Sequence, residues 1–300
     1  MEFLCEDLPQ HGLILVPPAS PDYESLLADI QARVSLSTEG APPIPERFRP
    51  RISEQDRSTS AILLNKSPKA IAAMQVVWQF ETATGRSYSH SRGMLSAQNL
   101  LLPFGRQDAS WAKIFGYWQT ILPGSKRYLS ESGMIGDNTD VRPPAADEKW
   151  RGGVVMGGGR GGGTFSDPVK QITLVLDGVF FLDGEFVGPD SGKLFERTVA
   201  DAGAHLTVAK IAQDAHNNGL TPTEILGEIE KVTGPATEFP ALDLVRNPDA
   251  TPEEFRQAAL KQIASQLTRS RQFPQGSNDE RTVYMVMAWA QTVLPQFRKG

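Results

Sequence analysis

The hydrophobic and polar positions of residues 57–91 alternate as they do in three consecutive β-strands. In the middle segment, Ile71 to Phe80, the larger apolar residues recur at every second position, which places them on one face of a strand. Trp78 lies among them, and we expect it to be buried. The polar segment Arg86 to Ser91 suits an edge strand. The pattern predicts that residues 57–91 form one wall of a β-sandwich.

A second strongly apolar segment, Val169 to Leu182, predicts a long strand, and we expect it to supply the opposite wall. Asp183 and Gly184 then suit a hairpin turn into a short strand, Glu185 to Val187. Shorter strands are predicted over Gly12–Val16 and Lys126–Ser132. The β-rich part of the chain therefore ends near Gly188.

Helical periodicity dominates the rest of the chain. Residues 191–217 carry an apolar stripe at helical spacing. Thr221 and Thr251 each begin the pattern T-P-x-E, a capping box with proline in the first turn, so each opens a further helix. A last helix is predicted over residues 280–297. Near the N-terminus, apolar residues at helical spacing predict a helix over residues 22–34.

These elements divide the chain into three regions. Residues 1–56 form an N-terminal strand and helix extension with a proline-rich linker. Residues 57–190 form the β-sandwich, interrupted by a glycine-rich insertion at 136–167. Glycine at that density opposes regular structure because ordering its backbone costs more conformational entropy. Residues 191–300 form an α-helical region.

Composition narrows the class of protein. Among 300 residues, 40% hydrophobic and 22% charged content are values typical of a globular protein. A net charge of -5 argues against nucleic-acid binding, which needs a basic surface. Cys5 is the single cysteine, so an intrachain disulfide and a thiolate metal site are both excluded. No segment is long and apolar enough to span a membrane, and no signal peptide is visible. We expect a cytoplasmic protein, or a secreted one if the true start lies upstream.

The histidines and the glycine-rich segment do not match a metal or nucleotide motif. Residues 152–163 lack the Lys-Ser or Lys-Thr of a phosphate-binding loop, so a flexible loop is the preferred interpretation. His11, His90, His205 and His216 show no H-x-x-x-H spacing. We interpret Asp201 and His205 as a surface pair four residues apart on a helix. We expect no cofactor and no metal.

The sequence also offers no clear nucleophile. No G-x-S-x-G motif occurs. Cys5 lies beside Glu2 and Glu6 in what we expect to be a loose terminus, and these acids would raise the pKa of its thiol. We therefore expect a protein that is not an enzyme.

An aromatic cluster is the main candidate for binding: Trp111, Phe115, Tyr117 and Trp118. Large aromatic side chains usually close one end of a core. An exposed cluster would instead bind a peptide, a glycan or a partner protein. The sequence alone leaves both interpretations open.

Several segments resemble a loose group of uncharacterised bacterial proteins. The segments are LLNKSPKAI (63–71), VVW (76–78), ILPGS (121–125) and LDGVFFLDGEFVGP (176–189), followed by LFER (194–197). The resemblance implies an immunoglobulin- or fibronectin-like sandwich that leads through a hairpin into a helix. Its motifs are structural, so it implies no catalytic residue.

The sequence thus predicts an α+β protein, with an antiparallel Ig/FnIII-like β-sandwich followed by C-terminal helices. We expect a non-enzymatic binding or protein-interaction module with a protein or peptide partner. One alternative is a hydrolase whose site combines dispersed histidine, aspartate and glutamate residues. Another is an oligomerisation scaffold that self-associates through residues 251–297.

Overall fold

The computed structural model describes residues 1–35, 52, 54–93, 120–131, 133–136, 168–235, 249–272, 279–290 and 294–300. The aromatic residues Trp111, Phe115, Tyr117 and Trp118 lie outside the described residues. So do nearly all of the predicted proline-rich linker and of the glycine-rich insertion at 136–167.

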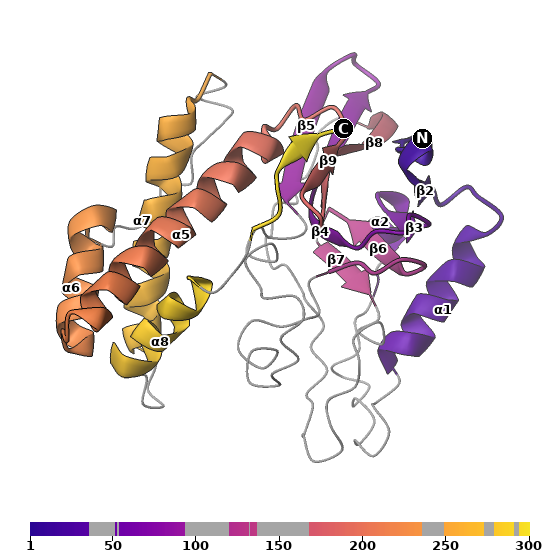
Figure 1. Cartoon of the computed structure of the whole chain (residues 1–300). Coiled ribbons are helices and arrows are strands. Elements are labelled where there is room, and N and C mark those ends of the chain that lie inside the picture. The colour runs from indigo at the N-terminus through magenta and orange to yellow at the C-terminus, as the bar shows by residue number, and fades with distance from the viewer. Residues whose placement is uncertain are drawn as a thin grey trace. The chain divides into compact units, whose positions relative to one another are not determined.

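The chain is an N-terminal β-sheet region followed by C-terminal helices (Figure 1). The N-terminal part contains β1 (Glu2–Glu6), a short 3-10 helix η1 (Pro9–His11), β2 (Leu13–Val16), α1 (Tyr23–Ser35), α2 (Glu54–Ser58), β3 (Ala61–Asn65), β4 (Ile71–Thr82), β5 (Ser87–Gly93), β6 (Lys126–Ser130), β7 (Gly133–Gly136), β8 (Val169–Phe181) and β9 (Glu185–Val187). The C-terminal part contains α5 (Leu194–Asn217), α6 (Pro222–Thr233), α7 (Pro252–Gln272), α8 (Asp279–Trp289) and β10 (Arg298–Lys299).

Two compact units share this chain. The first, here called the sheet unit, comprises the described residues up to Ser191 together with Arg298–Gly300. The second, the helical unit, comprises the described residues from Gly192 to Phe297. The helical unit is therefore inserted between β9 and β10 of the sheet unit.

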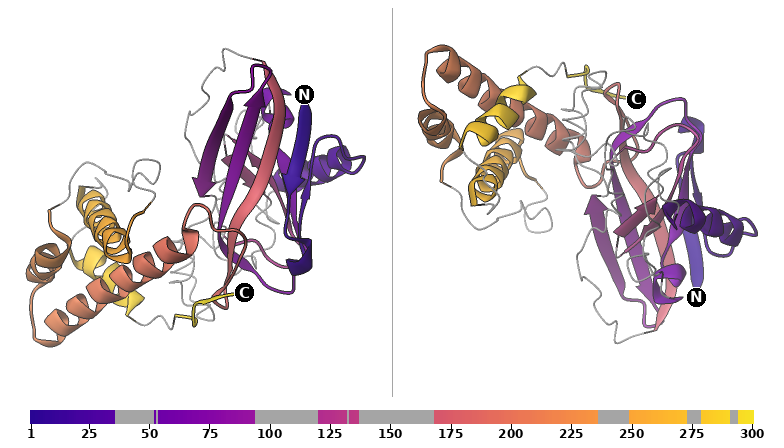
Figure 2. Two further views of the ribbon diagram at one scale, coloured as in Figure 1. Left: turned by 90° about the horizontal axis from the view of Figure 1, so that it is seen from above. Right: turned by 90° about the horizontal axis from the view of Figure 1, so that it is seen from below.

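The larger sheet of the sheet unit is organised around β8. Its strands follow the order β10-β9-β8-β4-β5, and β1 also pairs with β8. β8 is antiparallel to β4 along most of its length, whereas β1 runs parallel to its first half. Figure 2 shows β4, β5 and β8 side by side. The pairing of β1 departs from the purely antiparallel sheets that an immunoglobulin-like sandwich has.

The smaller sheet has the order β2-β3-β6-β7 and shares one hydrophobic core with the larger sheet. Strands β4 and β8 of the larger sheet contribute to this core Met74, Val76, Trp78, Phe80, Ile172, Leu174, Leu176, Val179 and Phe181. The smaller sheet contributes Leu13, Leu15, Ala61, Leu63, Leu129 and Met134. Trp78 is 0% exposed, and its Nε1 donates to the Thr59 carbonyl at 2.8 Å. The prediction of a buried Trp78 is confirmed.

The expectation that three consecutive strands form one wall is wrong. β3 belongs to the smaller sheet, whereas β4 and β5 belong to the larger one. β4 and β8, predicted to lie in opposite walls, are hydrogen-bonded neighbours in the same sheet. The reason lies in the segment between β3 and β4, which carries the chain from one sheet to the other. The prediction of β5 as an edge strand is confirmed within the described residues.

α1 covers the outer face of the smaller sheet. Tyr23, Leu27 and Ile30 of this helix form a second cluster with Val16, Ile62 and Tyr128 of the strands. The predicted N-terminal helix is confirmed by α1, and its apolar stripe explains this packing.

The helices of the helical unit enclose a core of their own. It includes Ala204, Val208, Ala212, Ile225, Ile229, Leu260, Ile263, Val283, Val286 and Trp289. The capping box predicted at Thr221 is confirmed, since its side chain accepts from Glu224 N while Glu224 bonds back to Thr221 N. The same exchange joins Thr251 and Glu254 at the start of α7.

The end of the chain differs from its prediction. α8 ends at Trp289, whereas a helix over residues 280–297 was expected. Pro295 explains part of the difference, because a proline inside a helix removes one hydrogen bond and clashes with the preceding turn. Arg298 and Lys299 form β10, a strand that the sequence pattern does not predict.

Candidate functional site

The turn between β3 and β4 is held by the buried side chain of Asn65. This residue is 0% exposed, and its Nδ2 donates to the carbonyls of Lys69 at 2.9 Å and Ile121 at 3.0 Å. Its Oδ1 accepts from Ser67 N at 3.1 Å. One amide group therefore joins the turn to the segment before β6 and fixes the position of Lys69.

Ser67 completes this turn. Its Oγ accepts from Lys69 N and donates to Lys69 O, both at 2.9 Å. A hydroxyl group has a single proton to donate. Because that proton already goes to Lys69 O, the Ser67 hydroxyl serves the turn and is not poised as a nucleophile.

The hairpin between β8 and β9 supplies the acidic half of the site. Gly184 has φ +85°, the left-handed conformation that glycine tolerates best. Asp183 Oδ1 accepts from Glu185 N at 3.1 Å, which closes the turn. The predicted hairpin at Asp183–Gly184 is confirmed, and it places both carboxylates toward Lys69.

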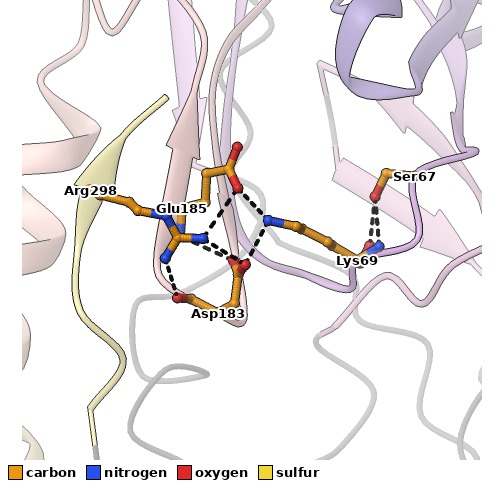
Figure 3. A network of polar contacts seen from close by, with 5 residues as sticks. All are labelled: Ser67, Lys69, Asp183, Glu185 and Arg298. Atoms are coloured by element: carbon orange, nitrogen blue, oxygen red, sulfur yellow. Dashed lines mark hydrogen bonds and ion pairs between the residues drawn. The ribbon is translucent and has the colours of Figure 1, made fainter.

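These carboxylates lie between two cations (Figure 3). Lys69 Nζ lies 2.6 Å from Asp183 Oδ2 and also bonds to Glu185 Oε2. Arg298 Nη2 lies 2.9 Å from Asp183 Oδ2 and 3.3 Å from Glu185 Oε2. Residues from β3–β4, from the β8–β9 hairpin and from the end of the chain therefore meet in one charge-balanced network.

The network shifts the pKa values of its members. Hydrogen bonds to Asp183 and then to Glu185 raise the pKa of Lys69. The hydrogen bond from Lys69 is the main cause that lowers the pKa of Glu185. Burial would raise the pKa of Asp183, but hydrogen bonds from Lys69, Glu185 N and Arg298 outweigh it and lower the pKa. All these groups are charged at neutral pH.

A pocket of about 280 Å³ opens beside the network. It is lined by Gln10, His11, Gly12, Lys66, Ser67, Pro68, Lys69, Phe181 and Glu185. Gly12 has φ +73°, and a Cβ there would lie 2.8 Å from Ser67 N, so glycine lets the two loops that form the wall approach each other. Within the part of the chain that the structure describes, the side chains of Lys66 and His11 form no hydrogen bond or ion pair.

A buried carboxylate, that of Asp177, marks the exit from the larger sheet. Asp177 is 1% exposed, and its Oδ1 accepts from Ser191 N at 2.8 Å and from Ser191 Oγ at 2.6 Å. Its Oδ2 accepts from Gln75 Nε2 at 3.2 Å. Gly188 has φ +116°, and a Cβ there would lie 2.7 Å from Asp177 O. Asp177 therefore anchors the segment that leads into the helical unit.

The histidines singled out in the sequence belong to different elements. His90 lies on β5 of the sheet unit, whereas His205 and His216 are eleven positions apart on α5. His205 is 0% exposed and packs edge-on against Trp289, so the prediction of a surface Asp201–His205 pair is wrong. Its Nδ1 does lie 3.4 Å from Asp201 Oδ1, and burial raises the pKa of Asp201.

Cys5 is not in a loose terminus, because β1 is paired with β8. The predicted direction of its pKa shift is confirmed, but the cause differs. Burial is the main cause, with Asp7 second, and together they raise the pKa of Cys5 to about 12. Its thiol therefore stays protonated at neutral pH.

The described helices include none that is both long and apolar enough for a membrane span. Among the described residues, no three or more histidine, cysteine, aspartate or glutamate side chains gather as metal ligands would.

The described parts of α7 and α8 supply buried residues to the helical core, while Tyr284 of α8 is 59% exposed. Self-association through residues 251–297 stays a prediction.

Lys69, Asp183, Glu185 and Arg298 were not predicted to form one group. Three of them lie inside segments that carry the resemblance, LLNKSPKAI and LDGVFFLDGEFVGP, but these were interpreted as structural only. No local pattern indicates Arg298. No protein-family model, curated protein or solved structure matches the chain, so its family is not identified by comparison.

Proposed function

We propose that the protein is a non-enzymatic binding module, and that its sheet unit takes a small ligand with an anionic group in the pocket beside Lys69. The observation that carries this proposal is the pocket of about 280 Å³, which is lined by Phe181 and by the basic residues His11, Lys66 and Lys69. Mostly preformed concave sites with a few polar groups are where proteins bind small molecules.

Charge supports an anionic ligand. Lys69 already has Asp183 and Glu185 as partners. Lys66 has no such partner among the described residues, and an ammonium group offers three donors. A carboxylate or phosphate group would therefore bind Lys66, with His11 beside it.

The state of Ser67 supports binding over hydrolysis at this pocket. Its hydroxyl proton is donated to Lys69 O, so attack on a bound group would first have to break the turn. The turn itself is held by Asn65, whose amide bonds to both sides of it. Hydrogen bonds thus fix the turn that carries Ser67 and Lys69 at one side of the pocket.

The immunoglobulin- or fibronectin-like assignment belongs to the same proposal. Two sheets that enclose one core, with Trp78 buried between them, support it. In such sandwiches, loops at one end commonly carry the binding residues. Here the β3–β4 turn and the β8–β9 hairpin supply that end.

Thermal denaturation with a panel of small anions tests the proposal. Inorganic phosphate, acetate, citrate and the acidic amino acids are each added at about 10 mM, and a ligand that binds only the folded state raises Tm. We expect at least one to raise Tm of the wild type and to lose this effect in Lys66→Ala. Lys210→Ala, which removes an exposed lysine of α5, is the matched control. A response equal in all three proteins, or none from any anion, would contradict the pocket as a binding site.

A further inference from the structure

The last three residues of the chain lie along β9 as a bound peptide would. β10 pairs with β9 in parallel, with Arg298 beside Glu185 and Lys299 beside Phe186. Arg298 N donates to Gly184 O at 3.1 Å, and Gly300 N donates to Phe186 O at 2.8 Å. Backbone pairing of a short segment at a sheet edge is how many proteins bind extended peptides.

The side chains of Arg298 and Lys299 each contact acidic residues of the sheet unit. Arg298 bonds to Asp183 and Glu185, and its Nη1 also donates to Asp183 O at 3.1 Å. Lys299 Nζ lies 2.9 Å from Asp190 Oδ2 and 5.9 Å from the centre of the Phe186 ring. Successive side chains of a strand point to opposite sides. The edge of β9 therefore contacts Arg298 on one side and Lys299 on the other.

The charges show what the site requires. Asp183 and Glu185 carry two negative charges, and without the C-terminal residues Lys69 is their one cation within the described network. Arg298 supplies the second positive charge. A site that keeps excess negative charge when empty attracts a basic segment.

The chain's own segment is held by contacts that a competitor can replace. The side chains of Arg298 and Lys299 are each 48% exposed, so water reaches and partly screens the cationic end of each ion pair. β10 is two residues long, so few backbone bonds hold it. Because β10 is covalently linked to the rest of the chain, its effective concentration at the edge of β9 is high, and this linkage favours its binding there.

We propose that the edge of β9 is a binding site for an extended basic segment of another protein, with arginine followed by lysine, and that residues 298–300 occupy it as a tethered ligand. The segment displaces β10 and takes over its contacts with Asp183, Glu185 and Asp190. This inference does not depend on the anion pocket, because it needs neither Lys66 nor His11.

Peptide binding to the full chain tests it. The probe is a peptide with the sequence of residues 296–300, QFRKG. The double variant Arg298→Ala/Lys299→Ala empties the site, and a tether that supplies about millimolar effective concentration should weaken the peptide by about tenfold in the wild type. We therefore expect the double variant to bind the peptide about tenfold more tightly by isothermal titration. Lys210→Ala/Lys231→Ala, which removes two exposed cations of the helical unit, should bind it like the wild type.

Two controls define specificity. A peptide in which glutamates replace arginine and lysine should not bind, and Asp183→Asn added to the double variant should lower affinity at least tenfold. In the wild type, excess peptide should shift the NMR signal of the Gly300 amide as its bond to Phe186 O breaks. This second measurement holds even if the double variant unfolds.

Three results would overturn the proposal. They are a folded double variant that does not bind the peptide, equal binding of the glutamate peptide, and a Gly300 signal that excess peptide leaves unchanged. A wild-type dimer that Asp183→Asn abolishes would support the site, with a second copy as the source of the segment.

Discussion

The side chain of Asn65 hydrogen-bonds to two segments that lie far apart in the sequence. Its Nδ2 reaches Lys69 O within its own turn and Ile121 O, 56 positions further on. A buried amide is costly unless its groups are hydrogen-bonded. Here both ends of the amide have partners, so Asn65 stabilises the frame on which Lys69 and Ser67 stand.

Trp78 is the residue on which the packing of the two sheets depends most visibly. Its ring is fully buried in the shared core, and its Nε1 donates to Thr59 O. We expect Trp78→Ala to lower the free energy of unfolding by about 3 to 5 kcal/mol, because the truncation leaves a cavity.

Chemical denaturation measures this change. Trp78→Phe, which keeps one aromatic ring and loses the donor and part of the indole volume, should cost less. Tyr284→Ala is the control for loss of an aromatic residue at an exposed position, and we expect a change within about 0.5 kcal/mol. An unchanged stability for Trp78→Ala would contradict the shared core.

At the scale of elements, β9 and β10 form an edge whose attachment depends on charge. Asp183 and Glu185 have lowered pKa values, so the stabilisation that their charges give to the attached β10 is complete above their ordinary pKa values of 3.8 and 4.5. It is lost as the pH falls through the lowered values. Lys69 has a raised pKa, so its contribution is complete below its ordinary value of 10.5 and is lost as the pH rises through the raised one.

We therefore expect β10 to stay attached at neutral pH and to detach in acid before the core unfolds. The NMR signal of the Gly300 amide, followed from about pH 8 down to about pH 2, reports this detachment. Asp183→Asn should weaken attachment at neutral pH because one carboxylate is already neutral. A Gly300 signal that is independent of pH until global unfolding would show that the ion pairs do not hold β10.

The strand patterns, the hairpin turn and the capping boxes were predictable at this scale. Each depends on residues that are close in the sequence, as in Thr221 with Glu224 or Asp183 with Gly184. β1 and β10 were not predicted. β10 is only two residues long, and such a segment has no periodicity to detect.

For the whole molecule, the main feature is an inserted helical unit. The chain leaves the sheet unit after Ser191 and returns at Arg298. The two crossing points are adjacent, since Asp190 Oδ2 and Lys299 Nζ are 2.9 Å apart. Among the described residues, the sheet unit and the helical unit form separate hydrophobic cores.

We expect the sheet unit to fold after residues 192–297 are removed and Ser191 is joined to Arg298 by a short glycine linker. Insertions are tolerated where both ends lie together at the surface. Circular dichroism and NMR should show a folded β-protein, and residues 192–297 expressed alone should be helical. An unfolded sheet unit would show that its core depends on the helical unit.

The sequence by itself determined the local elements and the faces they bury. Alternation along Ile71–Phe80 marks a strand, and the T-P-x-E pattern marks a helix start, because these properties depend on neighbouring residues. Only the tertiary structure decided which strands pair and which charges meet. Lys69 and Asp183 are 114 positions apart, and alternation shows which face of a strand is buried without naming its neighbour. The candidate site lies at such non-local contacts, so its residues became visible only once the chain was folded.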